Sequence, residues 1–315
     1  SVQPGETGPV WASLIIRSQA PGCPQITQEV SLYAGIKRID FANRLLKDAT
    51  PLQEVYFAFP LACHEPRFRF ESSNAIVTPV RDQLPGTNTD AYAVQHWVEV
   101  SDRTGTACWS GLEAPVVALG ELWTLPVSQA HHCVRSPDYA HEFLRDGLGF
   151  RQGHIYSCAL VSNFRTNFPP VQVSDGLFRY SMTTGANDEY EGESTRFGWA
   201  SANPLLAVCI CGPQPGDLPG VASFCHIGEP NIHLLAMKSA EDGDGVILRI
   251  AETSGRDTTA SITLPYLRPV QAFATDLVER NRGVLAVRDC SIQVPVPANG
   301  IATVRCRTRR SRSET

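Results

Sequence analysis

Hydrophobic and polar side chains alternate with a period of two along most of this chain. In residues 38–45, three apolar side chains and Asn43 share one face of an extended backbone, while arginines and Asp40 share the other. The same alternation recurs in residues 55–61 and 67–71. Because successive side chains of a strand point to opposite faces, the pattern predicts half-buried antiparallel strands. Each sheet should have one face on a core and one face in water.

Proline and glycine residues, 23 and 24 in number, separate these segments. They form turn signals such as Ala20-Pro-Gly22, Leu84-Pro-Gly86 and Pro295-Val-Pro297. Helical patterns are scarce: residues 191–201 are the best candidate, and residues 136–145 could carry a turn or two. A parallel α/β fold would need long crossover helices. We therefore predict an all-β protein of the sandwich type, with a helix content below about a quarter.

A Pro/Gly-rich seam at residues 212–220 predicts two domains. Residues 1–205 would form a large sandwich, residues 206–308 a smaller one, and residues 309–315 a basic tail. Strands expected in the second domain are 234–238, 246–251, 259–264, 270–274, 284–287 and 301–306. Gly243-Asp-Gly245 suits a tight hairpin turn that needs positive φ. We interpret the basic run from Arg305 to Arg312 as a solvated, frayed end.

The composition of the chain argues against some classes of function. A net charge of −5 gives no support for nucleic-acid binding, which leaves a basic footprint. No apolar run approaches the roughly 18 residues that span a bilayer, so no membrane is expected. The ten cysteines lie mostly inside apolar runs and form no Cys-x-x-Cys motif. This usage indicates free thiols in a reducing compartment and favours the cytoplasm.

Three clusters carry metal-ligand residue types, and none has the spacing of a complete site. In His131-His-Cys133 only the first and third side chains share a strand face, and no second pair follows at a suitable distance. Cys209-Ile-Cys211 is interpreted as two packed thiols. Glu241-Asp-Gly-Asp-Gly245 lacks the further oxygen ligands and closing glutamate of a calcium loop, so a hairpin turn is expected.

Several segments resemble one known family, in that family's order. The strongest is His154-Ile-Tyr-Ser-Cys-Ala-Leu-Val-Ser-Asn163-Phe-Arg-Thr-Asn167-Phe, followed by Phe178-Arg-Tyr-Ser181 and by residues 235–252. Residues 33–44, 55–60 and 95–102 add to the resemblance. Together they resemble the C-terminal β-rich region of family 38 glycoside hydrolases, the α-mannosidases. Phe164 departs from the pattern, because a tryptophan is frequent there, and this puts a sugar-stacking role at that position in doubt.

The resemblance implies a galactose-mutarotase-like super-sandwich followed by a smaller β-sandwich. It also implies that the catalytic aspartates and a zinc-type divalent metal belong to an N-terminal catalytic domain, which would be this region's partner. No cofactor, nucleophile or general acid is expected in this chain. The expected role is a non-catalytic region that braces the catalytic domain and borders its site for mannose-containing glycans.

Six residues are candidates for a carbohydrate or domain interface: Asn163, Thr166, Asn167, Arg179, His96 and Trp97. The first four are polar residues in otherwise apolar strands, where an unpaired amide or guanidinium is costly. They could form an internal hydrogen-bond network, or a surface that meets the catalytic domain near its sugar site. A tryptophan beside polar donors, as at Trp97, suits either sugar stacking or a core.

Two alternatives from other functional classes remain open. A free-standing carbohydrate-binding module would need exposed aromatic residues along a sheet face. A mutarotase or epimerase would need a histidine and a carboxylate that converge in one concave site, and the fold alone does not exclude it.

Overall fold

The computed structural model describes residues 1–73, 75–85, 87, 89, 91–122, 150–162, 169–186, 192–213, 215–216 and 218–308. Strands contain 55% of the described residues and helix 4%, which confirms the all-β prediction. The chain forms two compact units. Unit 1 comprises residues 1–190 and 197–204, and unit 2 comprises residues 191–196 and 205–315. Among the described helical residues, no helix is long and apolar enough to cross a membrane.

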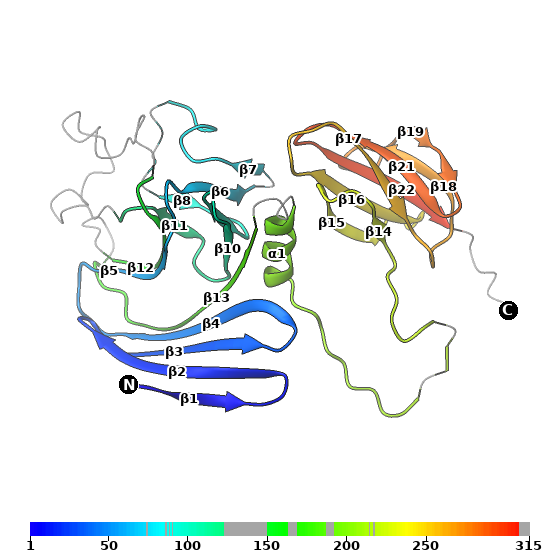
Figure 1. Ribbon diagram of the computed structural model, residues 1–315. Helices are drawn as coiled ribbons and strands as arrows, with labels where there is room; N and C mark the ends of the chain where they lie inside the picture. The colour runs from blue at the N-terminus through cyan, green and yellow to red at the C-terminus, as the bar shows by residue number, and fades with distance from the viewer. Residues whose placement is uncertain are drawn as a thin grey trace. The chain divides into compact units, whose positions relative to one another are not determined.

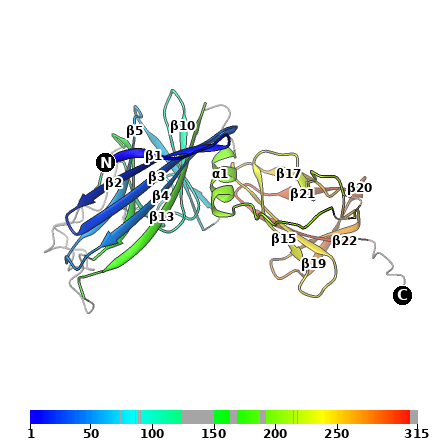
Figure 2. The ribbon, with the colours of Figure 1, turned by 90° about the horizontal axis from the view of Figure 1, so that it is seen from below.

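Unit 1 contains a large antiparallel sheet and a small one, shown as separate layers in Figures 1 and 2. The large sheet has nine described strands in the order β1 (Val2–Thr7), β2 (Trp11–Ala20), β3 (Cys23–Tyr33), β4 (Ile36–Lys47), β13 (Ser174–Gly185), β10 (Thr106–Gly111), β9 (Val98–Ser101), β6 (Arg67–Ser72) and β7 (Ala75–Val77). The small sheet has four: β5 (Glu54–Leu61), β12 (Gly153–Val161), β11 (Val116–Leu119) and β8 (Tyr92–Ala93). This is the super-sandwich that the resemblance implied.

The core of unit 1 lies between the two sheets and is rich in aromatic rings. Phe59 of β5 contacts Tyr180 of β13, with 5.0 Å between ring centroids, and Trp109 of β10 at 5.7 Å. Phe57 and Phe59 lie on one face of β5, as the period-two pattern predicted, and both are buried. The Ala20-Pro-Gly22 turn joins β2 to β3, with Ala20 opposite Cys23 and Gly22 at a φ of 75°.

One helix, α1 (Glu193–Ala202), confirms the helix expected at residues 191–201. Its second half belongs to unit 1. Gly198 allows close packing there, because a Cβ at this position would lie 2.6 Å from the Trp97 ring. A larger residue would therefore push the helix away from the sheet.

Unit 2 is the smaller β-sandwich, with its own hydrophobic core. One sheet has the order β14 (His226–Ile227), β17 (Thr258–Thr263), β21 (Ser291–Val296) and β20 (Val287–Arg288). The other has the order β15 (Ile232–Ser239), β16 (Val246–Glu252), β22 (Ile301–Thr308), β18 (Pro269–Thr275) and β19 (Asn281–Leu285). Every pairing between described strands is antiparallel.

Three sequence interpretations in unit 2 were wrong. Cys209 and Cys211 were interpreted as packed thiols on one strand face, yet both are exposed and lie in a segment without strand or helix. Pro295 was assigned to a turn, yet it lies within β21 opposite Thr259. It is tolerated because β20 pairs with only the first two residues of β21, which leaves an open edge beside Pro295 for its missing N–H. The basic run was read as a solvated end from Arg305 onward, yet Arg305 lies in the central strand β22 and is 3% exposed.

Candidate functional site

Arg179 is the one member of the predicted polar set that the structure describes; Asn163, Thr166 and Asn167 lie outside the described residues. Its side chain is 55% exposed and pairs with Glu113, with 2.6 Å between Nη2 and Oε1. The Arg179 backbone N–H also donates to the Glu113 carboxylate, at 2.7 Å. Arg179 therefore takes part in an exposed ion pair at the start of the loop that follows β10.

His96 belongs to a partly buried cluster with Glu71 and Trp199. One Glu71 oxygen lies 2.9 Å from His96 Nδ1, and the other accepts a hydrogen bond from Trp199 Nε1 at 3.0 Å. The His96 ring also lies 4.4 Å from the Trp199 ring, centroid to centroid. Glu71 is 4% exposed, so its carboxylate is held by these partners rather than by water. The cluster fastens the second half of α1 to the end of β6.

Trp97, next to His96, is 1% exposed and packs against Gly198 of α1. A ring with no accessible face offers nothing for a sugar to stack on, so the geometry fits the core alternative. The sequence pattern did not single out Glu71, because the alternation places it on the polar face with Arg67 and Arg69. That face is covered at Glu71 by a helix more than a hundred positions further along the chain, which a local pattern cannot show.

In unit 2 the Glu252 carboxylate joins three loop segments. It accepts hydrogen bonds from Asn231 Nδ2 at 2.7 Å, from the Gly255 N–H at 2.8 Å and from the Asn299 N–H at 2.9 Å. Burial alone would raise the pKa of Glu252, but the hydrogen bonds from Ser254, Asn299 and Asn231 outweigh it and lower the pKa to about 2. Glu252 ends the segment 235–252 that carried part of the resemblance. Its role in this structure is to hold the loops together.

The acidic hairpin at Glu241–Gly245 is a turn, as predicted. Gly243 and Gly245 have φ values of 74° and 96°, and the two aspartates pair with arginines of β22. The hydrogen bond from Arg305 lowers the pKa of Asp242 to about 2. Within the described ranges no three His, Cys, Asp or Glu side chains come together to hold a metal. His131 and Cys133 lie outside the described residues.

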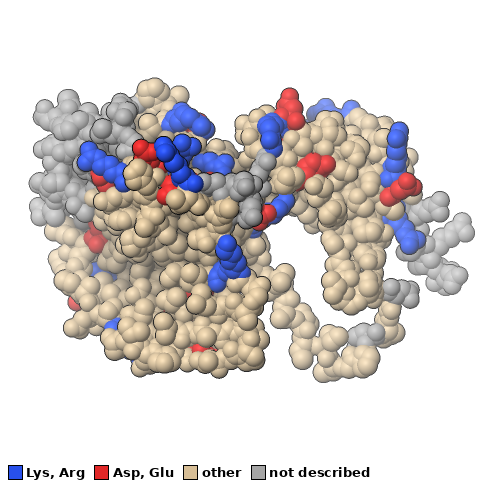
Figure 3. Space-filling model, viewed as in Figure 1, with Lys and Arg blue, Asp and Glu red and all other residues tan. Residues whose placement is uncertain are grey.

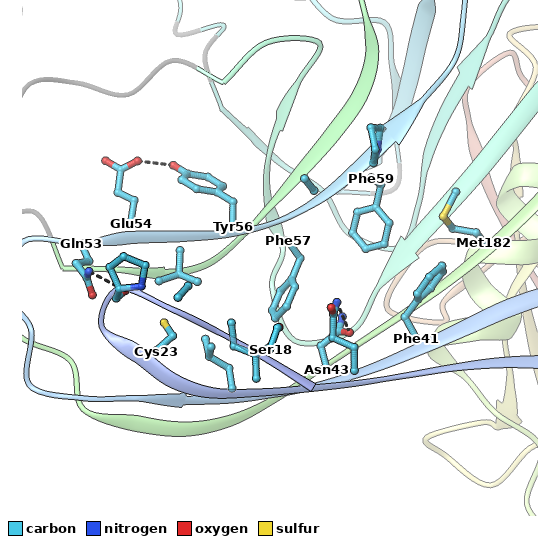
Figure 4. A pocket seen from close by; sticks show the side chains of 18 of the residues that line it. Ser18, Cys23, Phe41, Asn43, Gln53, Glu54, Tyr56, Phe57, Phe59 and Met182 are labelled. Carbon is cyan, nitrogen blue, oxygen red and sulfur yellow. Dashed lines mark hydrogen bonds between the residues drawn. The ribbon is translucent and has the colours of Figure 1, made fainter. Parts of the chain in front are cut away.

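A groove of about 620 Å³ opens in unit 1 between β5 and the inner face of β2–β4. Figure 4 shows Phe57 and Phe59 pointing from β5 into this groove, toward Asn43 and Phe41. Tyr56 points away on the other side of β5, where its hydroxyl donates to Glu54 at 2.7 Å. Burial and this hydrogen bond raise the pKa of Tyr56. The walls of the groove are mostly apolar.

Two side-chain amides provide hydrogen-bonding groups in the groove. Gln28 Nε2 donates to Asn43 Oδ1 at 3.2 Å, and Asn43 is 1% exposed. The titratable residues along the groove are Cys23, Glu54 and Tyr56, and Figure 4 shows the last two side chains hydrogen-bonded to each other on the far side of β5. The groove is suited to binding an apolar group, with one or two hydrogen bonds to fix its position.

The described chain consists of two all-β sandwiches, the first with an aromatic core. Residues 231–304 match the family described as "Glycosyl hydrolases family 38 C-terminal beta sandwich domain". The fold matches an alpha-mannosidase from Enterococcus faecalis V583 with a TM-score of 0.69 and 13% identity, over 97% of this chain and 35% of that one. A glycosyl hydrolase family 38 protein from Enterococcus faecalis gives 0.69 and 14%, over 97% of this chain and 36% of that one. No curated protein sequence matches the chain.

Both findings support the resemblance inferred from the motifs: residues 231–304 match the C-terminal β-sandwich domain of family 38 glycoside hydrolases, and the fold of the chain is similar to the C-terminal β-rich region of such proteins. The chain spans about a third of the length of the solved structures that it matches.

Proposed function

We propose that this chain is the non-catalytic β-rich part of an α-mannosidase-like family 38 enzyme. It would brace the catalytic domain and border its carbohydrate site, while a zinc-type metal and the catalytic carboxylates belong to the rest of the parent protein. The observation that carries the proposal is the family match at residues 231–304, within a fold that fills only 35% of a matching alpha-mannosidase chain.

The charged residues of the chain agree with this role. Retaining glycoside hydrolysis needs two carboxyl groups about 5 Å apart across the scissile bond. The described carboxylates with buried side chains, such as Glu71 and Glu252, are instead occupied by hydrogen bonds within the fold. Positioning without a nucleophile cannot by itself accelerate hydrolysis.

An apolar segment offers further support for a missing partner. Leu205 is 100% exposed, Leu206 93% and Val208 81%. Such a run of exposed apolar side chains is typical of a surface that another part of a protein covers. We also propose a reducing, cytoplasmic location, which agrees with the free thiols of Cys23, Cys225 and Cys306.

The test is hydrolysis of an aryl α-mannoside by this chain and by the longer polypeptide of the same gene. We expect no turnover by the chain alone, with or without zinc or cobalt, and metal-dependent turnover by the longer polypeptide. Metal-dependent turnover by the chain alone, lost in Glu71→Gln, would overturn the proposal. We choose Glu71 for this variant because its carboxylate pairs with His96, and a histidine with a carboxylate is the pair that a mutarotase or epimerase would need.

A further inference from the structure

The two sheets of unit 1 differ in width, and this leaves part of the larger one uncovered. Residues Leu14, Val30, Phe41 and Tyr180 are directly opposite one another on β2, β3, β4 and β13. They form one cross-strand row and therefore share a face. Tyr180 is buried in the core at 2% exposure, whereas Leu14, at the other end of the row, is 48% exposed. The core face thus continues outward over β3 and β2, where no described strand of the small sheet covers it.

Neighbouring rows show the same trend. Leu32 of β3 lies opposite Ile39 of β4, which lies opposite Met182 of β13. Met182 is buried, whereas Leu32 is 56% exposed. Val2 of β1 lies opposite Ile16 and is 67% exposed. Over β1–β4, the face shown in Figure 3 carries few charged side chains. Strands β1–β3 therefore present apolar residues on the side where the small sheet should lie.

The small sheet stops at β5, whose outer edge is open. Among the described strands, β5 pairs only with β12. Pro60 lies opposite His154 in that pairing. Because proline has no N–H, the hydrogen bonds between β5 and β12 are made by the residue pairs on either side of this one. Backbone groups alternate in direction along a strand, so those of Tyr56, Ala58 and Pro60 point away from β12. Within the part of the chain that the structure describes, the N–H groups of Tyr56 and Ala58 thus lie on an edge that no strand pairs with, and the groove of about 620 Å³ lies beside it.

We propose that the small sheet is extended at β5 by a strand from the part of the parent polypeptide that this chain does not contain. A strand added there would lie about 4.8 Å from β5 and about 10 Å from the large sheet, over β3 and β2. Its backbone would bond with Tyr56 and Ala58. Its alternate side chains would be apolar and would fill the groove, with a polar group near Gln28 and Asn43.

The occupant is a segment of the same polypeptide, because this chain fills only 35% of a matching alpha-mannosidase chain, which leaves a large remainder to supply it. Exposed sheet edges are normally protected in folded proteins, and the addition of a strand is a direct way to protect one. The inference rests on the proposed function in one respect, namely that the chain is part of a longer family 38 protein.

Amide hydrogen exchange at residue resolution tests the inference, by comparison of this chain with the longer polypeptide of the same gene. In this chain the amides of Tyr56 and Ala58 should exchange rapidly, while those of Phe57 and Phe59, which bond to β12, serve as internal slow references. In the longer polypeptide we expect Tyr56 and Ala58 to slow at least about tenfold, the effect of roughly 1.4 kcal/mol of added protection. Equal exchange in both proteins would overturn the inference.

Substitutions provide a second measurement. Ser18 lines the groove and Arg17 lies on the opposite face of the same strand. Ser18→Trp should fill the groove and keep the Tyr56 and Ala58 amides fast in the longer polypeptide, whereas the control Arg17→Trp should leave them slow. Slow exchange in both variants would contradict strand addition at this groove.

Hydrolysis of an aryl α-mannoside by the same preparation separates the two proposals. A longer polypeptide that is active but leaves Tyr56 and Ala58 fast would retain the proposed function and overturn the added strand. Protection of both amides in a polypeptide that hydrolyses no α-mannoside would support the strand and overturn the function.

Discussion

The backbone N–H of Asn299 donates to the Glu252 carboxylate at 2.9 Å, across 47 positions of the chain. This bond ties the turn before β22 to the end of β16, and the same carboxylate also holds Asn231. Three segments of unit 2 that are separate in sequence therefore depend on one negative charge. The strength of this arrangement can be measured through its pH dependence.

The first prediction concerns acid stability of unit 2. The folded pKa of Glu252 is lowered from 4.5 to about 2, so its contribution to stability is complete above the unfolded pKa. The contribution is lost as the pH falls from about 4.5 toward 2, and its full size is roughly 3 kcal/mol. Glu252→Gln should remove most of it at pH 7 and flatten the dependence in this range.

Calorimetric unfolding from pH 7 to 3 measures the effect. Because all five tryptophans lie within residues 1–204, tryptophan fluorescence reports on unit 1 and serves as the control. The fluorescence transition should be unchanged in Glu252→Gln. An equal shift of both transitions would contradict a role confined to unit 2.

The second prediction contrasts a buried and an exposed arginine. Arg305 donates through Nη1 to Asp242 at 2.7 Å and through Nη2 to the Glu279 carbonyl at 2.9 Å. A lysine cannot reach both acceptors with one ammonium, so Arg305→Lys should cost about 1–3 kcal/mol of unfolding free energy. Arg179→Lys, in an exposed pair, should cost about 0–1 kcal/mol. Urea denaturation measures the loss of unfolding free energy in both variants, and similar losses would contradict the prediction.

The third prediction tests the attachment of α1 to unit 1. Trp199→Phe removes the indole N–H that donates to Glu71 and leaves a buried carboxylate with one partner fewer. We expect a loss of about 1–3 kcal/mol and faster amide exchange in residues 197–203. Trp11→Phe is the matched control, since Trp11 starts β2 and donates to no carboxylate in the described structure. Unchanged exchange in α1 would show that the Gly198 packing alone holds the helix.

Much of this architecture was predictable from local pattern. The alternation in residues 38–45 placed Asn43 and Leu45 on the core face, and both are buried. The helix at 193–202 and the Gly243–Gly245 turn were also predicted, because each depends on residues close together in sequence.

Features that depend on distant segments were not predictable in this way. Glu71 is buried by a helix more than a hundred positions later, and the buried Arg305 bonds to the Asp242 carboxylate and the Glu279 carbonyl, which belong to two other turns. The free edge of β5 follows from a difference in width between two sheets, which no single strand reveals. The candidate site was the least predictable part, because an exposed ion pair such as Arg179–Glu113 and a partly buried pair such as His96–Glu71 have similar sequence patterns.

The fourth prediction concerns the thiols. Denatured protein without reductant should yield all ten thiols on titration. In the native state the exposed Cys209 and Cys211 should react first. Cys306 is 0% exposed, and burial raises its pKa to about 12, so it should react only on unfolding. A native disulfide that involves Cys209 or Cys225 would contradict the prediction and the proposed reducing compartment.

The last prediction concerns the apolar segment that follows α1. Leu205 and Leu206 are almost completely exposed, and the described residues from 205 to 225 belong to no strand or helix. A protease with a preference for large apolar residues should therefore cut this chain first near Leu206, well before it reaches buried sites such as Leu248.

Leu206→Ser should slow that cleavage and leave the unfolding free energy within about 0.5 kcal/mol of the parent value, because the side chain makes no core contact. Leu248→Ser, at a buried position in β16, is the contrasting control and should destabilise unit 2 by several kcal/mol, on the order of 2–5. Mass spectrometry of early fragments identifies the first cut. If that cut fell within a strand instead, or if Leu206→Ser destabilised the chain as strongly as Leu248→Ser, the segment would have to be packed in solution.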